Sequence, residues 1–167
     1  MANHPSIFLS YNPGNQAEET LALRLHTLGI VNGLTMHLPE RGYLGQLITE
    51  ETKSRIAASN YYILFSTSPQ LGKVALEEIG YAFSRFQDKS RIIIIYDRAR
   101  GKNMMGTDQC TELYFDRNTE TQEAFIQKVI QSIRNKEKKN TDNEALAGFV
   151  LAGLGLLFLG AVLSGKK

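Results

Sequence analysis

The chain has 167 residues, a formal net charge of +2 and a single cysteine, Cys110. Such a length accommodates one ordinary domain and a short appendage, and a charge balance this close to neutral gives no electrostatic reason to expect a nucleic-acid partner. The lone cysteine excludes an internal disulfide and fits a reducing compartment, most simply a cytoplasm. The N-terminal residues lack the basic region and long apolar run of a signal peptide.

Strand and helix signals alternate along the first 134 residues. Apolar stretches bounded by turn residues predict strands over 6–11, 33–38, 61–66, 91–97 and 111–116. The fourth is the clearest, because its isoleucines follow one another without alternation, as in a strand covered on both faces of its sheet.

Helical spacing of apolar residues connects these strands. The first helix carries its apolar stripe on Ala17, Leu21, Leu25 and Leu28. Gly29 is positioned to end that helix. A polar helix is predicted over about 45–59. The next has its stripe on Leu76, Ile79, Ala82, Phe83 and Phe86, and the last on Phe125, Ile126, Val129, Ile130 and Ile133.

This alternation predicts a flavodoxin-like α/β fold, a three-layer sandwich around a five-stranded parallel sheet. Sheets of this kind bind ligands beyond the carboxyl ends of their strands, near the topological switch point. The loops that leave the strands are therefore the places where a site is expected.

The composition changes after the domain, which we expect to cover residues 1–134. Residues 135–144 are a charged linker, and residues 145–164 carry no charge. As a helix, the second stretch spans about 30 Å, the thickness of a bilayer core, which predicts a single C-terminal transmembrane helix. A buried helix or a self-association segment is the alternative. More basic residues precede the stretch than follow it, so the positive-inside rule places the domain in the cytoplasm.

Several familiar chemistries of α/β proteins are excluded. The acidic residues of a phosphoacceptor site are missing after the first and third strands, and neither a G-x-x-x-x-G-K-[ST] loop nor a G-x-S-x-G elbow occurs. His4, His26 and His37 are scattered and lack metal-ligand spacing with Cys110, so no metal site is predicted.

Three segments resemble a Toll/interleukin-1 receptor (TIR) domain of the bacterial kind. IFLSYN (7–12) resembles the first strand and its exit, and LPERGYLGQLI (38–48) the loop after the second strand. YYILFSTSP (61–69) with KVALEEIGYA (73–82) resembles the third strand and the helix that carries the family's catalytic glutamate. The resemblance covers roughly residues 5 to 134.

The resemblance implies an enzyme that cleaves NAD+ at the bond between nicotinamide and ribose. NAD+ is then the substrate, with no further cofactor and no metal. The family pattern selects Glu78 as the catalytic carboxylate. Helix geometry puts Glu78 on the border of the apolar stripe, whereas Glu77 points about 100° away and is expected to be more solvated. Read without the resemblance, both are ordinary helix formers near a helix start.

The remaining site residues follow from the same resemblance. The expected substrate-binding residues are Ser10, Tyr11, Asn12, Glu40, Arg41, Gly42, Tyr43, Ser66 and Val74. Arg41 is the candidate partner for a phosphate, with an ordinary solvated loop charge as the alternative. Gly42 permits a positive φ or a close approach of the ligand. Val74 stands where many members carry an aromatic residue, and Asn15 where an acidic residue is common.

The implied whole is a membrane-anchored NAD+ hydrolase or cyclase in bacterial anti-phage defence, which signals or depletes NAD+. TIR enzymes self-associate, so a homo-oligomer through TIR–TIR contacts is expected, with the membrane bound through residues 145–164. One alternative is a non-catalytic TIR scaffold that recruits another TIR protein or effector to the membrane. Another is a relative of the nucleoside deoxyribosyltransferases. The product is left open between ADP-ribose, a cyclic isomer and a base-exchange product.

Overall fold

The computed structural model describes residues 4–40 and 48–141. Its strands are β1 (Ser6–Ser10), β2 (Thr35–His37), β3 (Tyr61–Ser66), β4 (Ile92–Asp97) and β5 (Thr111–Phe115). Its helices are α1 (Gln16–Val31), α2 (Glu50–Ala58), α3 (Lys73–Arg85), the 3-10 turn η1 (Lys89–Arg91) and a helix over residues 122–141. The chain divides into two compact units after Ile130, and the first unit contains all the labelled elements.

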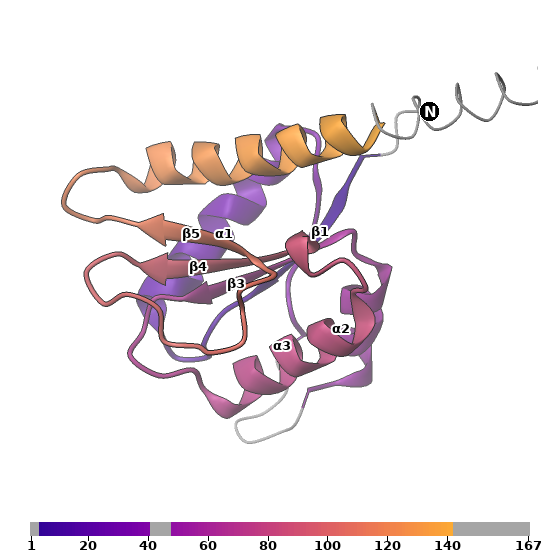
Figure 1. The fold of residues 1–167 in the computed structure, drawn as a ribbon, viewed down its shortest axis with the longest axis horizontal. Coiled ribbons are helices and arrows are strands. Elements are labelled where there is room, and N and C mark those ends of the chain that lie inside the picture. The colour runs from indigo at the N-terminus through magenta and orange to yellow at the C-terminus, as the bar shows by residue number, and fades with distance from the viewer. Residues whose placement is uncertain (1–3, 41–47, 142–167) are drawn as a thin grey trace, which may run out of the picture. The chain divides into compact units, whose positions relative to one another are not determined.

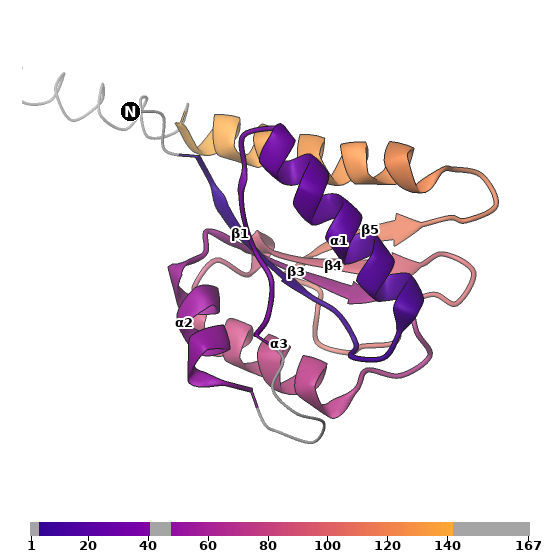
Figure 2. The same cartoon turned by 180° about the vertical axis from the view of Figure 1, so that it is seen from behind.

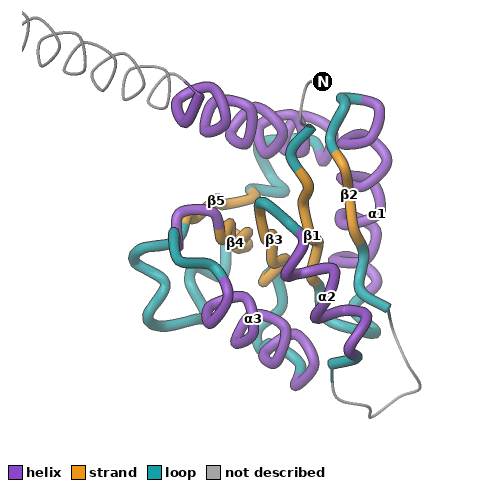
Figure 3. The backbone as a smooth tube through the Cα atoms, turned by 90° about the vertical axis from the view of Figure 1, so that its right-hand side faces the viewer, coloured by secondary structure: helices purple, strands orange, loops and turns teal. Residues whose placement is uncertain are grey.

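The five strands form one parallel sheet in the order β2-β1-β3-β4-β5. Figure 3 shows this order across the sheet. In Figures 1 and 2, α2 and α3 lie on one face of the sheet and α1 lies on the other, together with residues 122–130. The predicted five-stranded parallel sheet is confirmed, and its strand order is the one found in flavodoxin-like folds.

The middle of the sheet is buried on both faces. All six residues of β3 and all six of β4 are buried, and the two strands pair in parallel from Tyr62 with Ile92 to Ser66 with Tyr96. Continuous apolar strands of this kind need helices on both sides, because a solvated face would expose every second side chain. The prediction made from the isoleucines of β4 is therefore correct.

The prediction that Gly29 ends the first helix is wrong. α1 runs on to Val31, with Asn32 as its C-cap, and Gly33 takes the positive φ of 78° that turns the chain toward β2. Gly29 is buried inside the helix, where an added Cβ would lie 2.7 Å from the sulfur of Met36. Any larger residue at position 29 would therefore require the Met36 side chain to shift.

The predicted apolar stripes are partly wrong. Ala17 is exposed, and Leu76 is 50% exposed. The buried face of α1 includes Glu18, and that of α3 includes Glu78. A polar side chain therefore occupies one position on each buried face, while Ala17 and Leu76, expected on those faces, are exposed.

No helix connects β4 to β5, in agreement with the absence of a helical pattern between these two strands in the sequence. Residues 98–110 form a loop on the face that carries α3, and Met104 packs against the core there. Polar contacts hold the loop: the Lys102 ammonium lies 2.8 Å from Glu112 of β5 and 3.0 Å from Asp108, and Thr107 donates to Glu112. These contacts replace the packing of a crossover helix.

The last helix is longer than expected. The last helix continues to residue 141, so the first residues of the expected linker are helical. Within residues 4–40 and 48–141, no helix is long and apolar enough to cross a membrane. The expected membrane segment, residues 145–164, lies outside the described residues.

Candidate functional site

Ser10 and Glu78 meet at the carboxyl end of β1. Phe8 belongs to the cluster that packs against α3, and because side chains alternate along a strand, Ser10 faces the same way. The Ser10 hydroxyl donates a hydrogen bond to Oε2 of Glu78. Both side chains are buried, with exposures of 0% and 1%. A buried carboxylate is costly unless hydrogen bonds stabilise it, so this contact helps to explain why α3 tolerates an acid on its inner face.

Glu77, the neighbouring acid, is not simply solvated as was expected. Its side chain is half-buried, and its Oε2 accepts a hydrogen bond of 3.1 Å from the backbone N–H of Ile48. Ile48 is the first described residue after the gap that contains most of the loop following β2. The two adjacent acids of α3 thus make different contacts. Glu78 bonds to Ser10 of the sheet, and Glu77 bonds to Ile48, just before α2.

Asn12 connects the exit of β1 with the start of α3. Its amide nitrogen donates to the Ser68 hydroxyl and, at 3.4 Å, to the Gln70 carbonyl. Its carbonyl oxygen accepts from the backbone N–H of Gly72, the N-cap of α3. Gly72 offers no side chain to cap the helix, so Asn12 fixes the position of Gly72 from the loop after β1. Both the nitrogen and the oxygen of the Asn12 amide thus already have hydrogen-bond partners within the protein.

Glu18 is a second buried carboxylate, and the sequence analysis missed it. It lies in the first turn of α1 and is 0% exposed. Its oxygens accept hydrogen bonds from the exits of both β1 and β3, at Asn12, Thr67 and Ser68. The signal that was available is the spacing Asn15-x-x-Glu18, which is that of a capping box. Asn15 does cap the helix, accepting from the N–H groups of Ala17 and Glu18.

Ser66 ends β3 on the same face as Ser10, and its hydroxyl is also used internally. It donates to Oδ1 of Asn103, 2.7 Å away, in the loop between β4 and β5. The amide nitrogen of Asn103 in turn donates to the Ser68 carbonyl at 2.8 Å. Asn103, which sequence reasoning did not select, therefore closes the carboxyl edge of the sheet between β3 and β4.

The other expected site residues are placed only in part. Tyr11 is buried at the exit of β1, and Val74 is half-buried one turn before Glu78. Glu40 is exposed, and its backbone is held by Thr52 of α2 at 3.0 Å. Arg41, Gly42 and Tyr43 lie outside the described residues. The structure thus brings Ser10 to Glu78, and it gives no placement for the loop expected to face them.

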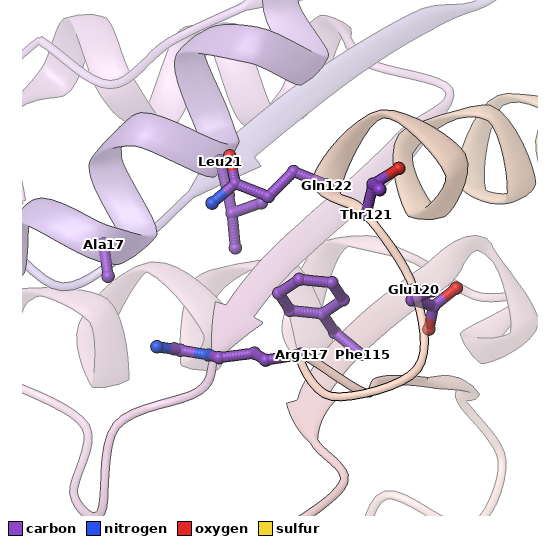
Figure 4. Close-up of a pocket in the computed structure, with 7 residues that line it drawn as sticks. All are labelled: Ala17, Leu21, Phe115, Arg117, Glu120, Thr121 and Gln122. Atoms are coloured by element: carbon purple, nitrogen blue, oxygen red, sulfur yellow. The ribbon is translucent and has the colours of Figure 1, made fainter.

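Two of the hollows among the described residues are lined in part by the N-terminal half of α1. One, of about 340 Å³, is shown in Figure 4 and is lined by Ala17, Leu21, Phe115, Arg117, Glu120, Thr121 and Gln122. The other is an open depression of about 680 Å³ lined by residues 12–17 with Ser68, Gln70 and Gly72. Glu78 is not among the residues that line either hollow.

The pKa values of several groups in and next to the loop between β4 and β5 are shifted. A hydrogen bond from Lys102 lowers the pKa of the Glu112 carboxyl, and the same bond raises the pKa of Lys102 above its usual range. Lys102 is thus paired with two acids, Asp108 and Glu112. Burial raises the pKa of the Cys110 thiol, so this cysteine is a weak nucleophile at neutral pH.

Comparisons with known proteins identify the fold. No family profile and no curated protein matches the chain. The flavodoxin-like domain of a Synechococcus sp. protein matches with a TM-score of 0.50 and 13% identity, over 75% of this chain and 92% of that domain. The flavodiiron core of Flv1 from Synechocystis sp. PCC6803 matches with a TM-score of 0.50 and 12% identity, over 79% of this chain and 37% of that core.

A conserved protein from Enterococcus faecalis V583 matches with a TM-score of 0.48 and 11% identity, over 78% of this chain and 99% of that protein. Identities this low speak to architecture and not to activity. Together with the strand order, the matches at 0.50 show that this chain contains a flavodoxin-like α/β domain.

Proposed function

We propose that the chain is a membrane-anchored TIR-domain NAD+ hydrolase or cyclase with Glu78 as its catalytic carboxylate. The observation that supports this most is the pairing of Glu78 with Ser10 at the carboxyl end of a central parallel strand. Ligands of parallel α/β sheets bind at that edge, where the strand order reverses between β1 and β3. The carboxylate that the TIR resemblance selects therefore lies at the edge where a substrate is expected.

The chemistry suits one buried acid. As the bond between the nicotinamide nitrogen and ribose C1′ breaks, positive charge develops on the ribose, much as in glycoside hydrolysis. A fixed carboxylate in a poorly solvated site stabilises that charge, because little reorganisation is needed. Nicotinamide leaves as a neutral molecule with the bonding electron pair. Water then bonds to C1′ and releases a proton, giving ADP-ribose, or an adenine nitrogen bonds instead and gives the cyclic isomer.

Self-association and anchoring complete the proposal. In this reading the loop containing Arg41, Gly42 and Tyr43 closes the site from a neighbouring copy. The apolar residues 145–164 hold copies in one membrane with the domain in the cytoplasm, which raises their effective concentration. Such an enzyme would act in anti-phage defence through NAD+ depletion or a nucleotide signal.

A non-catalytic TIR scaffold is the second candidate, and one observation favours it. Glu78 is only 1% exposed in the single copy and is already bonded to Ser10. A carboxylate in that situation can serve the fold alone. In that case Glu78 would matter for stability, and no NAD+ would be consumed.

The test compares nicotinamide release by matched variants. The full chain, reconstituted at high density in lipid vesicles, is incubated with NAD+, and the products are separated by chromatography. Glu78→Gln keeps the shape of the side chain and removes its charge. We expect it to lower release by roughly 100-fold or more. Glu19→Gln, on the exposed face of α1, is the control and should match the unchanged chain. Equal nicotinamide release by the unchanged chain and by Glu78→Gln would contradict a catalytic role for Glu78. If none of the proteins releases nicotinamide, the result would favour the scaffold.

A further inference from the structure

The carboxylate of Glu18 sits in a complete set of hydrogen-bond donors. Its Oε1 accepts from the N–H groups of Thr67 and Ser68, both at 2.9 Å, and from their hydroxyls at 3.2 and 3.0 Å. Its Oε2 accepts from the N–H of Asn12 at 2.9 Å. Three backbone N–H groups and two hydroxyls thus converge on one anion that has no exposed surface.

These donors have the character of an oxyanion site. Within the described residues, no lysine, arginine or histidine forms an ion pair with Glu18, so its charge is held by dipoles. Successive backbone N–H groups pointing into a concavity are the usual means by which proteins bind phosphate and similar anions. Hydrogen bonds to an ionised acceptor are about twice as strong as those between neutral groups.

The position of these donors is that of a ligand site. Asn12 follows β1, and Thr67 and Ser68 follow β3, so the donors lie at the point where the strand order reverses. Sheets of this order bind their ligands at this point. The open depression of about 680 Å³ is lined by Asn12 and Ser68, two of the three residues that supply these donors.

We propose that Glu18 is the chain's own occupant of an oxyanion site at the β1/β3 switch point, and that removing its carboxylate opens this site to a small oxyanion. In the unchanged chain the occupied site excludes a ligand phosphate from the α1 side of the edge. A ligand that binds at the switch point is thereby confined to the α3 side, where Ser10 and Glu78 lie. The proposal does not depend on NAD+ cleavage.

The test is rescue of a Glu18 variant by an added anion. Glu18→Ala removes the carboxylate and leaves space, Glu18→Gln fills the space with a neutral amide, and Glu19→Ala is the control on the exposed side of the same turn. Thermal unfolding of each full chain in detergent is followed by circular dichroism at pH 7. Sodium acetate or sodium phosphate is compared with sodium chloride at equal ionic strength.

We expect Glu18→Ala to have a lower Tm than the unchanged chain in chloride. Acetate at 100 mM should raise its Tm by about 4 °C, the shift for a site of roughly 10 mM affinity in a domain of this size. The unchanged chain, Glu18→Gln and Glu19→Ala should not respond. A response to acetate but not to phosphate would limit the site to planar carboxylates.

If Glu18→Ala is unfolded in chloride, the readout becomes the recovery of its helical signal as acetate or phosphate is added. The proposal is overturned if Glu18→Ala gains no more from the anions than Glu19→Ala does, or if it stays unfolded in both anions. Neither result would alter the nicotinamide assay, so the two proposals fail separately.

Discussion

The hydroxyl of Ser10 donates a hydrogen bond to the carboxylate of Glu78, although 68 positions separate the two residues in the chain. The contact joins the carboxyl end of β1 to the second turn of α3, the helix that also packs its apolar side chains on that face of the sheet. It therefore fixes the orientation of the candidate catalytic group from a rigid element rather than from a loop.

Replacing Ser10 by alanine tests this relationship. The substitution removes one donor from a buried carboxylate, so we expect the free energy of unfolding to fall by about 1–3 kcal/mol. If Glu78 is catalytic, nicotinamide release should also fall by roughly 10- to 100-fold, because the carboxylate is less well positioned. Urea denaturation and the chromatographic assay measure the two effects. Ser84→Ala is the control on the exposed side of α3, where the hydroxyl only contacts the Tyr81 carbonyl. A Ser10→Ala protein as stable as this control would show that the contact contributes nothing.

The ion pair under the loop between β4 and β5 predicts a pH dependence. The pKa of Glu112 is lowered in the folded state by Lys102, so its stabilising contribution is present above the ordinary value of 4.5 and is lost as the pH falls through the lowered pKa. Lys102→Met should therefore destabilise the protein most between about pH 5 and 8, and the loss should shrink toward pH 3.

Unfolding in urea at a series of pH values measures this difference. Lys53→Met is the control, because Lys53 forms a surface pair with Glu50 within one helix. If Lys102→Met lowers the free energy of unfolding equally at pH 3 and pH 7, the ion pair between Lys102 and Glu112 does not stabilise this loop.

Two helical glycines should respond to alanine in opposite directions. At Gly29 a Cβ would meet the sulfur of Met36 at 2.7 Å, so Gly29→Ala should cost about 1–3 kcal/mol despite the better helix propensity of alanine. At Gly80 a Cβ would meet nothing within 4 Å, so Gly80→Ala should stabilise by about 0.5–1 kcal/mol. Thermal and urea unfolding compare the pair. A gain in stability at both positions would show that the Met36 side chain can move away from position 29 at little cost.

The expected membrane anchor can be tested without reference to catalysis. Two lysines in the middle of the apolar stretch, Leu156→Lys with Leu157→Lys, should oppose insertion by about 5–7 kcal/mol on the biological scale. We expect the unchanged chain to float with vesicles in a density gradient and the double variant to stay at the bottom. Lys166→Gln with Lys167→Gln changes charge at the end of the stretch and should still float. Flotation of the double variant would favour the alternative of a self-association segment.

The parts of the fold that the sequence predicted are those decided by local pattern. The isoleucine run of β4 could only be a strand buried on both faces, and the spacing of the five apolar stretches gave the parallel sheet. Glu78 was selected by resemblance, and its contact with Ser10 supports that choice without testing it. The connection over residues 98–110 has no periodic signal and is a loop, but its ion pair between Lys102 and Glu112 could not be predicted from local pattern.

Local pattern also misled at the two buried acids. A carboxylate on a helix is ordinarily solvated, so Glu18 was passed over and Glu78 was placed only at the border of a stripe. Both are buried because strands from elsewhere in the chain bring hydroxyl and N–H donors to them. Those donors are known only once β1 and β3 lie side by side.

By itself the sequence determined that this chain forms a parallel α/β sheet, because burial of apolar side chains at strand and helix spacing is a local property of the chain. The tertiary structure alone decided which polar groups are enclosed with them. A charged group is stable inside a protein only where partners converge on it, and Ser10 at Glu78, like Thr67 and Ser68 at Glu18, comes from far away in the sequence.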